Sequence, residues 1–198
     1  MLDQLWALVV FALIATGSPG GATTLATASG ARFGYRRSIP LILGIAFALA
    51  GLVAVSGAGL ATSLQAMPLL ELGVKAVGSI YLLWLAAKVG LAGPPAPAQV
   101  DDEQPISLFR GAMLLTVNPK AWAMALGVAS SFAELANEPL LLGGILALVF
   151  GLSALVSLTV WALAGGLIAR CLSTDQHWHL FNGTMAVLLS ASIIQFWV

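Results

Sequence analysis

The first apolar segment of the chain is interrupted by the stretch Thr16-Gly17-Ser18-Pro19-Gly20-Gly21. A related stretch, Thr116-Val117-Asn118-Pro119-Lys120, interrupts another apolar segment later in the chain. Proline has no amide N–H to donate and its ring clashes with the preceding turn, so each stretch predicts a broken helix. Inside a membrane, broken backbone is tolerated only where it is buried in protein or lines a cavity. Two breaks at matching places therefore indicate a binding site.

The composition is that of a membrane protein. The 198 residues are 60% hydrophobic and only 8% charged, with a mean hydropathy of +0.99. A soluble domain carries about 25% charged residues, so the chain is not expected to be a soluble globular protein. The formal net charge is zero, which gives no indication of a nucleic-acid partner. The expected surroundings are the lipid bilayer.

Six apolar segments are long enough to cross a bilayer, which takes about 20 helical residues. They cover residues 4–28, 38–62, 69–91, 107–132, 139–168 and 178–197, and the first and fourth contain the prolines of the two breaks. The N-terminus, Met1-Leu2-Asp3-Gln4, lacks the basic residues that open a secretory signal peptide. We therefore expect the first segment to be retained as a membrane helix.

Basic residues predict the orientation of these segments. Positive charge in short loops stays on the cytoplasmic side. With six spans, every basic connection falls on one side and both termini lie outside, in the periplasm. The basic residues of these connections are Arg32, Arg36, Arg37, Lys88, Arg110 and Arg170.

A linker rich in proline and acidic residues, at 92–106, divides the chain near its midpoint. Its composition favours an extended, solvated and here cytoplasmic segment. Three spans precede it and three follow, so the second half enters the membrane with the opposite orientation. The prediction is an all-α membrane protein of one transmembrane domain, 1–198. Its six transmembrane helices form two inverted-topology three-helix repeats, 1–91 and 107–198, with helices 1 and 4 broken at proline.

Small residues recur at helical spacing in the second and fifth segments, where close backbone approach holds membrane helices together. The predicted packing stripes are Gly44, Ala48, Gly51 and Val55, then Gly151, Leu155 and Thr159, with Ser153 and Ser157 on a neighbouring stripe. Tryptophan is typical of membrane interfaces. We expect interfacial or lipid-facing positions for Trp6, Trp84, Trp161 and Trp197.

Lys120 is the most informative single residue. A lysine at the centre of a membrane helix costs about 2.5–3.5 kcal/mol on insertion scales, and such residues usually face the bundle interior or a water-filled cavity. Substrate binding is one interpretation. The other is that the ammonium snorkels or satisfies carbonyls freed by Pro119.

Polar side chains cluster around both breaks. Their hydroxyl and amide groups suit capping of the half-helices, which by itself explains their presence. Exposed half-helix N-termini also attract an anionic group, so the combination suits a zwitterion, with its ammonium on backbone carbonyls. The candidate substrate-binding residues are Thr16, Ser18, Pro19, Gly20, Thr23, Thr116, Asn118, Pro119 and Lys120.

Two further charged residues lie near the predicted outer interface. Glu71 and Lys75 are four positions apart with the acid first, a spacing that favours an ion pair on a helix. They are candidates for a gate, or form a pair whose side chains snorkel to the interface.

Motifs of enzymes and cofactor sites are absent from the sequence. There is no Gly-x-Ser-x-Gly, no His-Glu-x-x-His and no phosphate-binding loop. His177 and His179 lack an evident third ligand. We predict a protein that is not an enzyme, with no metal site and no cofactor.

Several motifs resemble the LysE/RhtB-type amino-acid exporter superfamily. They are Ser18-Pro19-Gly20-Gly21 with Gly34-Tyr35-Arg36-Arg37 and Gly44, Val74-Lys75-Ala76-Val77-Gly78-Ser79-Ile80-Tyr81-Leu82-Leu83-Trp84-Leu85, and Phe109-Arg110-Gly111 with Asn118-Pro119-Lys120-Ala121. The resemblance implies an inner-membrane exporter driven by a proton or ion gradient. Family members usually have Pro-Gly-Pro-Asn at the first break and often an acidic residue shortly after the glycine at Gly44. Here Ser18 and Gly21 replace the outer two residues, and the stretch 45–50 is uncharged.

The predicted function is secondary active export of amino acids or related small metabolites across the inner membrane. The alternative is a non-transporting membrane assembly or regulatory protein that uses the same fold without a hydrated cavity. An ion channel is disfavoured, because it would need rings of acidic or ligating residues within the spans, and the sequence has none evident there. The expected partner is a small-molecule substrate, an amino acid or similar zwitterion, and the sequence is compatible with a homo-oligomer.

Overall fold

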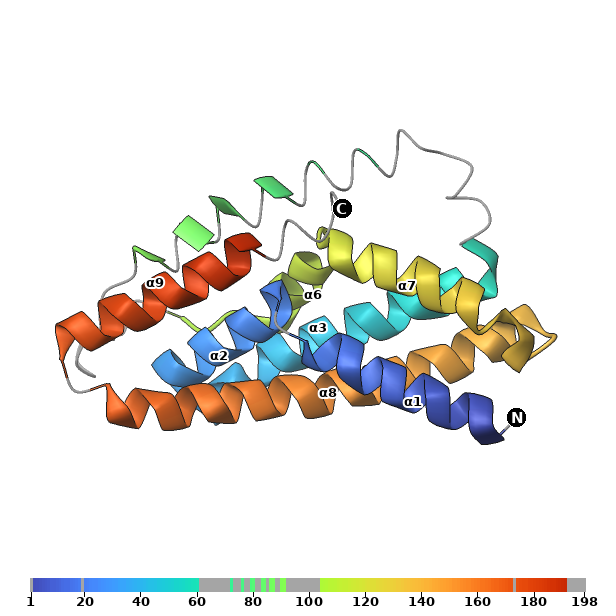
Figure 1. The fold of residues 1–198 in the computed structure, drawn as a ribbon, viewed down its shortest axis with the longest axis horizontal. Helices are drawn as coiled ribbons and strands as arrows, with labels where there is room; N and C mark the ends of the chain where they lie inside the picture. Colours follow the sequence, from blue (N-terminus) through green and yellow to red (C-terminus); the bar gives the residue numbers. More distant parts are fainter. Residues whose placement is uncertain are drawn as a thin grey trace.

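The structure is a computed structural model that describes residues 2–18, 20–60, 104–172 and 174–191, together with isolated residues between 72 and 91. Every regular element in this described part is helical. The helices lie lengthwise beside one another and form an elongated bundle (Figure 1). The prediction of an all-α protein is confirmed for these residues.

The first predicted span is two helices, α1 (Leu2–Gly17) and α2 (Gly21–Phe33), whose axes differ by 59°. The predicted break is confirmed, although Pro19 itself lies outside the described residues. α2 continues to Phe33, five residues beyond the predicted end at 28. It ends at Gly34, whose φ of 78° is a backbone conformation that favours glycine.

The second broken helix repeats this arrangement. α6 (Leu108–Thr116) and α7 (Pro119–Ser131) meet at a bend of 68°. Proline stands at the first position of α7, where the missing N–H is not needed by the helix. The predicted break at this proline is confirmed. A short 3₁₀ turn, η2 (Ala133–Leu135), follows.

Two long helices run most of the length of the bundle, and the first of them is continuous through Pro40. α3 (Tyr35–Val55) continues into a π-helical turn, η1 (Ser56–Leu60), and α8 (Pro139–Cys171) runs for 33 residues. α9 (Asp175–Ala191) is the last described helix.

Two of the described helices, Tyr35–Gly59 and Pro139–Cys171, are by themselves long and apolar enough to cross a membrane. The number rises to four when each bent pair counts as one span. Most of the predicted span at 69–91, the end of the span at 178–197 and most of the linker at 92–106 lie outside the described residues. Six spans in inverted repeats therefore stay a prediction.

Each broken helix packs on the long helix of the other half of the chain. α1 and α2 lie along α8, whereas α6, and less extensively α7, lie along α3. α3 and α8 also pack extensively against each other. The two halves are thus interlocked, and the breaks face the centre of the bundle (Figure 1).

Glycines allow the closest helix crossings. A Cβ atom on Gly30 of α2 would collide with the backbone of Ala162 in α8, and one on Gly165 of α8 would collide with the backbone of Thr27. Such contact between small residues is the usual means of packing helices in a membrane. The backbones of α2 and α8 therefore touch directly.

The predicted packing stripes are correct only in part. Gly44 of α3 meets the backbone of α6 at Leu108, but Gly51 is exposed and has open space where a Cβ would stand. On α8 the more deeply buried stripe is the neighbouring one, with Ser153 and Ser157 6% and 8% exposed. Ser157 of this stripe faces α1, where its hydroxyl donates to the carbonyl of Thr16.

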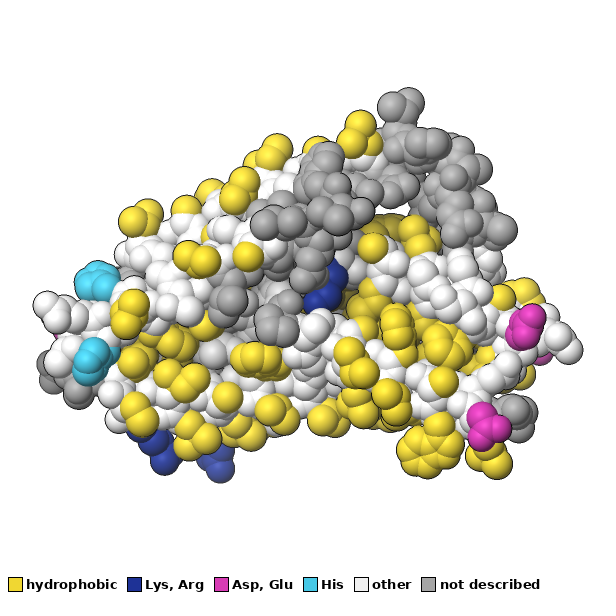
Figure 2. Space-filling view, in the orientation of Figure 1, with side chains coloured by type: hydrophobic (Ala, Val, Ile, Leu, Met, Phe, Trp, Pro, Cys, Tyr) yellow, Lys and Arg dark blue, Asp and Glu magenta, His cyan; other side chains and the backbone are white. Residues whose placement is uncertain are grey.

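The outer surface is largely apolar. On the face in Figure 2, hydrophobic side chains spread along the length of the bundle. Acidic side chains gather at the end where α1 begins, and most of the visible basic side chains lie toward the opposite end. An apolar band between two charged ends is the arrangement expected for a protein that spans a bilayer.

Candidate functional site at the two helix breaks

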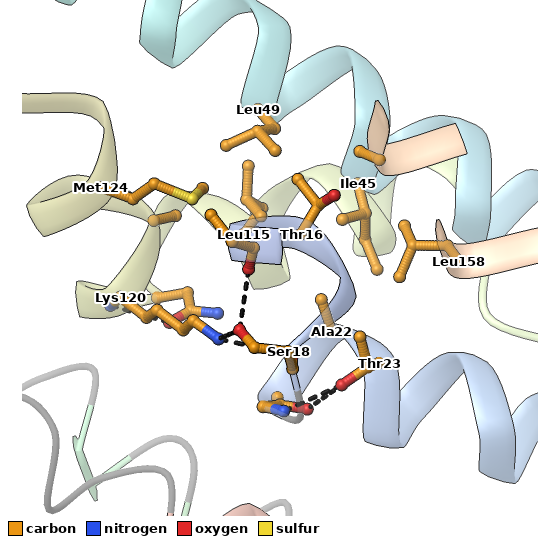
Figure 3. A pocket seen from close by; sticks show the side chains of 16 residues that line it. Thr16, Ser18, Ala22, Thr23, Ile45, Leu49, Leu115, Lys120, Met124 and Leu158 are labelled. Atoms are coloured by element: carbon orange, nitrogen blue, oxygen red, sulfur yellow. Dashed lines mark hydrogen bonds between the residues drawn. The ribbon is translucent and has the colours of Figure 1, made fainter. Parts of the chain in front are cut away.

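Residues of both helix breaks line one small cavity (Figure 3). Water centres can occupy about 40 Å³ of it, which is room for a few water molecules. Apolar walls come from α3 and α8, including Ile45, Leu49 and Leu158. The cavity brings together most of the residues predicted for the site: Thr16, Ser18, Gly20, Thr23, Asn118 and Lys120.

The ammonium of Lys120 connects the two halves of the chain. Its Nζ donates to Ser18 Oγ at 2.7 Å, and the carbonyl oxygen of Ser18 lies 3.5 Å from the same nitrogen. A Cβ atom on Gly20 would stand 3.3 Å from Nζ. Glycine at this position therefore leaves room for the ammonium against the backbone of the first break.

The N-terminus of α2 also faces the cavity. Its N-cap residue is Gly20, which has no side chain to cap the helix, and Gly21 and Ala22 of the first turn line the cavity. Thr23 Oγ1 accepts from the Gly20 N–H at 2.8 Å and donates to the Gly20 carbonyl at 3.0 Å. A helix N-terminus carries partial positive charge. Together with the lysine it makes this side of the cavity attractive to an anionic group.

The break leaves the carbonyls at the end of α1 without helical donors. Proline at position 19 has no N–H for the carbonyl of Ala15, and Ser18 Oγ donates to that oxygen instead, at 2.9 Å. Thr16 Oγ1 likewise donates backward, to the carbonyl of Ala12 at 2.7 Å. Both hydroxyls are thus committed to α1 itself and do not cap the next carbonyls along the chain.

Side chains of α8 supply the donors for those carbonyls. Ser157 Oγ donates to the carbonyl of Thr16 at 2.8 Å, and Trp161 Nε1 donates to the carbonyl of Gly17 at 3.1 Å. The prediction that Trp161 lies in an interfacial belt or faces lipid is wrong, since the side chain is half-buried against the first break. A freed carbonyl in the membrane needs a donor, and the indole N–H provides one.

The second break is closed by its own neighbours. Asn118 Oδ1 accepts from the N–H of Lys120 at 3.0 Å, and Trp122 Nε1 donates to the carbonyl of Thr116 at 2.7 Å. Asn118 is 7% exposed and caps α7 from within the cavity wall. Pro119 is the first residue of α7.

Some of the predicted site residues are not brought to the cavity. The side chain of Thr116 is exposed, and its hydroxyl donates to the carbonyl of Ala112 at 3.0 Å. Pro19 and the candidate gate residues Glu71 and Lys75 lie outside the described residues. Ser157 and Trp161 were not among the predicted site residues. Ser157 was predicted only as part of a packing stripe, and no signal in the sequence marked Trp161.

A helical membrane protein whose two broken helices meet at a cavity that contains a lysine and several other polar groups has the architecture of a membrane transporter. The chain belongs to the LysE type translocator family, whose model matches residues 13–196. It is therefore a multi-pass inner-membrane transporter rather than an enzyme, and the resemblance noted in the sequence is confirmed. The family, together with relatives that are named as efflux proteins, supports an exporter of small metabolites.

Three individual relatives share between 28% and 37% of their aligned residues with the chain. A cysteine/O-acetylserine efflux protein of Salmonella choleraesuis is 29% identical over 177 residues, covering 86% of this chain and 85% of the relative. The protein of the same name from Klebsiella pneumoniae is 28% identical over 167 residues, covering 83% of each chain. An uncharacterized membrane protein of Pseudomonas aeruginosa is 37% identical over 126 residues, which span 57% of this chain and 55% of that protein. No solved structure matches the chain.

Proposed function

We propose that the protein is a secondary active exporter of amino acids or closely related zwitterions, and that the substrate binds in the cavity between the two breaks. The observation that carries the proposal is the contact of Lys120 with Ser18, made beside the N-terminus of α2. It joins a positive charge, a helix terminus and backbone carbonyls within one small cavity.

The substrate carboxylate is assigned to the positive side of the cavity. The N-terminus of α2 and the Lys120 ammonium both attract an anion, and Gly20 places no side chain between them. The substrate ammonium is assigned to the oxygens of Ser18. Nζ of Lys120 occupies this place here, at 2.7 Å from Ser18 Oγ, which indicates that these oxygens suit a cation.

The size of the cavity and the names of relatives favour a small substrate. The cavity admits only a few waters in this structure, and its other walls are apolar side chains. Cysteine and O-acetylserine, named for the efflux proteins of Salmonella and Klebsiella, each carry one carboxylate and one ammonium on a short chain. We extend that substrate class, small amino acids and their O-acyl derivatives, to this protein.

The proposed membrane arrangement has six spans in two inverted repeats with both termini in the periplasm. Its support is the reciprocal packing of the bundle, since the broken helix of each half lies on the long helix of the other. A site between two interlocked repeats is what alternating access requires. The separation of acidic side chains at one end of the bundle from most of the visible basic side chains toward the other agrees with this orientation.

Efflux of O-acetylserine and cysteine from proteoliposomes tests the proposal. Lys120→Ala and Asn118→Ala are expected to reduce efflux by tenfold or more, because each removes a polar group from the cavity. Thr116→Ala is the matched control, since that side chain is exposed and does not line the cavity. Protein incorporated into the vesicles is measured for each variant. Normal efflux in both cavity variants would exclude this site.

A further inference from the structure

Three successive carbonyls at the end of the first helix half are each held by a side chain from the second half of the chain. The donors to residues 16, 17 and 18 are Ser157, Trp161 and Lys120, in that order. The lysine belongs to the proposed substrate site, but the two residues of α8 do not line the cavity. Ser157 and Trp161 therefore contribute through the backbone of the first break and not through contact with the substrate.

We propose that Ser157 and Trp161 are positioning residues for transport, which hold the first break in the shape that the substrate site needs. The inference rests on the proposed function for its link to transport. Its structural part, that α8 holds the break, is independent of any substrate.

The two donors act from one face of one rigid helix. Ser157 and Trp161 are four residues apart on α8, and residues at that spacing lie one above the other. A Cβ atom on Gly17 would stand 3.8 Å from Ser157 Oγ, so the end of α1 lies directly against this face. A shift of α8 along α1 would break both hydrogen bonds together. The first break can therefore change shape only when α8 moves or releases it.

The hydrogen bonds also fix the position of Ser18. The carbonyls of Thr16 and Gly17 belong to the two residues before it, and Ser18 presents its oxygens to Lys120. If α8 released these carbonyls, the oxygens of Ser18 would move relative to the ammonium. Loss of the α8 donors should thus loosen the substrate site without removing any group that touches substrate.

The experiment measures the accessibility of a cysteine in the cavity. Ala22→Cys, in the first turn of α2, reports on the cavity in a Cys171→Ser background, because Cys171 is the only native cysteine and is exposed. The reagent is a small polar maleimide. Ser157→Ala and Trp161→Phe each remove one donor, and Trp161→Phe keeps an aromatic ring in place.

Each variant is expected to raise the labelling rate about threefold, the average effect of one hydrogen bond between membrane helices. The double variant should raise it about tenfold if the two effects add. Ser157→Thr keeps the hydroxyl and should restore the parent rate. Ser153→Ala, buried in the same helix, and Trp6→Phe, on the outer surface, are matched controls that should leave the rate unchanged.

Transport is measured on the same variants without the reporter cysteine, with O-acetylserine and cysteine as probes. The inference expects KM to rise severalfold in Ser157→Ala and Trp161→Phe, with rescue by Ser157→Thr. Unchanged labelling and unchanged KM in the double variant would overturn it. A rise of the same size in the Ser153→Ala control would also overturn it, because the effect would then be one of general packing.

Failure of the proposed function would look different. If the parent protein moved neither probe, the substrate proposal would fail, while the labelling rates would still decide whether α8 holds the first break. If the parent moved a probe but the α8 variants behaved like the parent, the positioning role would fail and the proposed function would stand.

Discussion

The two helix breaks follow the same chemistry in sequence but are stabilised in different ways. At the second break, Asn118 caps α7 and Trp122 satisfies the carbonyl of Thr116, so every named donor lies within a few residues. At the first break, Gly20 has no side chain for capping, and the donors for the carbonyls of Thr16 and Gly17 come from α8. The second break is thus complete by itself, whereas the first depends on the other half of the chain.

We infer from this difference that the two breaks play different parts in transport. A self-capped break keeps its shape when its surroundings move, so α6 and α7 present Lys120 from a fixed position. A break held by a neighbouring helix changes when that neighbour moves. In an exporter of this architecture, we expect motion of α8 to displace the first break more than the second. Ser18 and the N-terminus of α2 meet the cavity at the first break.

The largest expected effect comes from separating α8 from α2. Gly165→Val places side-chain atoms where the backbone of Thr27 stands, and neither backbone can give way without moving a helix. Overpacking of this kind costs about 1–3 kcal/mol and sometimes more. We expect a large loss of monodisperse protein after extraction and a lower thermal transition.

Gly144→Val is the matched control for this substitution. It lies in the same helix, and a Cβ atom there has nothing within 4 Å. Equal yields and transition temperatures for the two variants would show that the close crossing of α2 and α8 is not needed to support the first break.

Removing the cap of the second break should have the next largest effect. Asn118→Ala loses the acceptor for the Lys120 N–H, and loss of an N-cap side chain costs about 0.5–2 kcal/mol. Asn118→Ser retains a capping oxygen and should recover most of the loss. The measurement is the midpoint of unfolding in detergent. Equal midpoints for Ala, Ser and Asn at position 118 would contradict the view that this break is closed locally.

Much of the fold followed from local chemistry in the sequence. Both breaks and a long apolar span at 139–168 were predicted, the breaks because proline removes a hydrogen bond from the interior of a helix. The donors from α8 were not predicted, since Ser157 and Trp161 are 141 and 144 residues from their acceptors. Membrane tryptophans usually lie at interfaces, and nothing in the local sequence marks one that caps a carbonyl.

The spacing of the polar residues predicted the lining of the cavity less well than the prolines predicted the helix breaks. Thr16 and Thr116 occupy equivalent positions before the two breaks, which predicted equivalent roles. Only Thr16 lines the cavity, because the side chain of Thr116 is on the exposed side of α6. The same residue type three positions before a proline thus faces inward in one half and outward in the other, and its direction depends on how each helix half packs.

A capping side chain added at the first break would make it resemble the second break. Gly20→Ser adds a hydroxyl at the N-cap of α2, where the nearest atom to the new Cβ would be Nζ of a flexible lysine, at 3.3 Å. The hydroxyl would occupy the N-terminus assigned to the substrate carboxylate. A charge at a helix terminus gains about 0.3–1 kcal/mol, so we expect KM for O-acetylserine to rise about two- to fivefold with no loss of stability. An unchanged KM would mean that the carboxylate binds elsewhere.

The smallest expected effect is at the indole that closes the second break. Trp122→Phe removes the donor to the carbonyl of Thr116 but keeps the aromatic ring, and a hydrogen bond between side chain and backbone in a membrane protein is worth about 0.6 kcal/mol on average. That carbonyl lies on the exposed side of the break, away from the contacts that hold α6 and α7 on the rest of the bundle. Trp122→Phe should therefore lower the unfolding midpoint slightly and leave the labelling rate of Ala22→Cys unchanged, in contrast to Trp161→Phe. If the two tryptophan variants raised that rate equally, the second break would depend on its indole as much as the first depends on α8, and the asymmetry between the breaks would be lost.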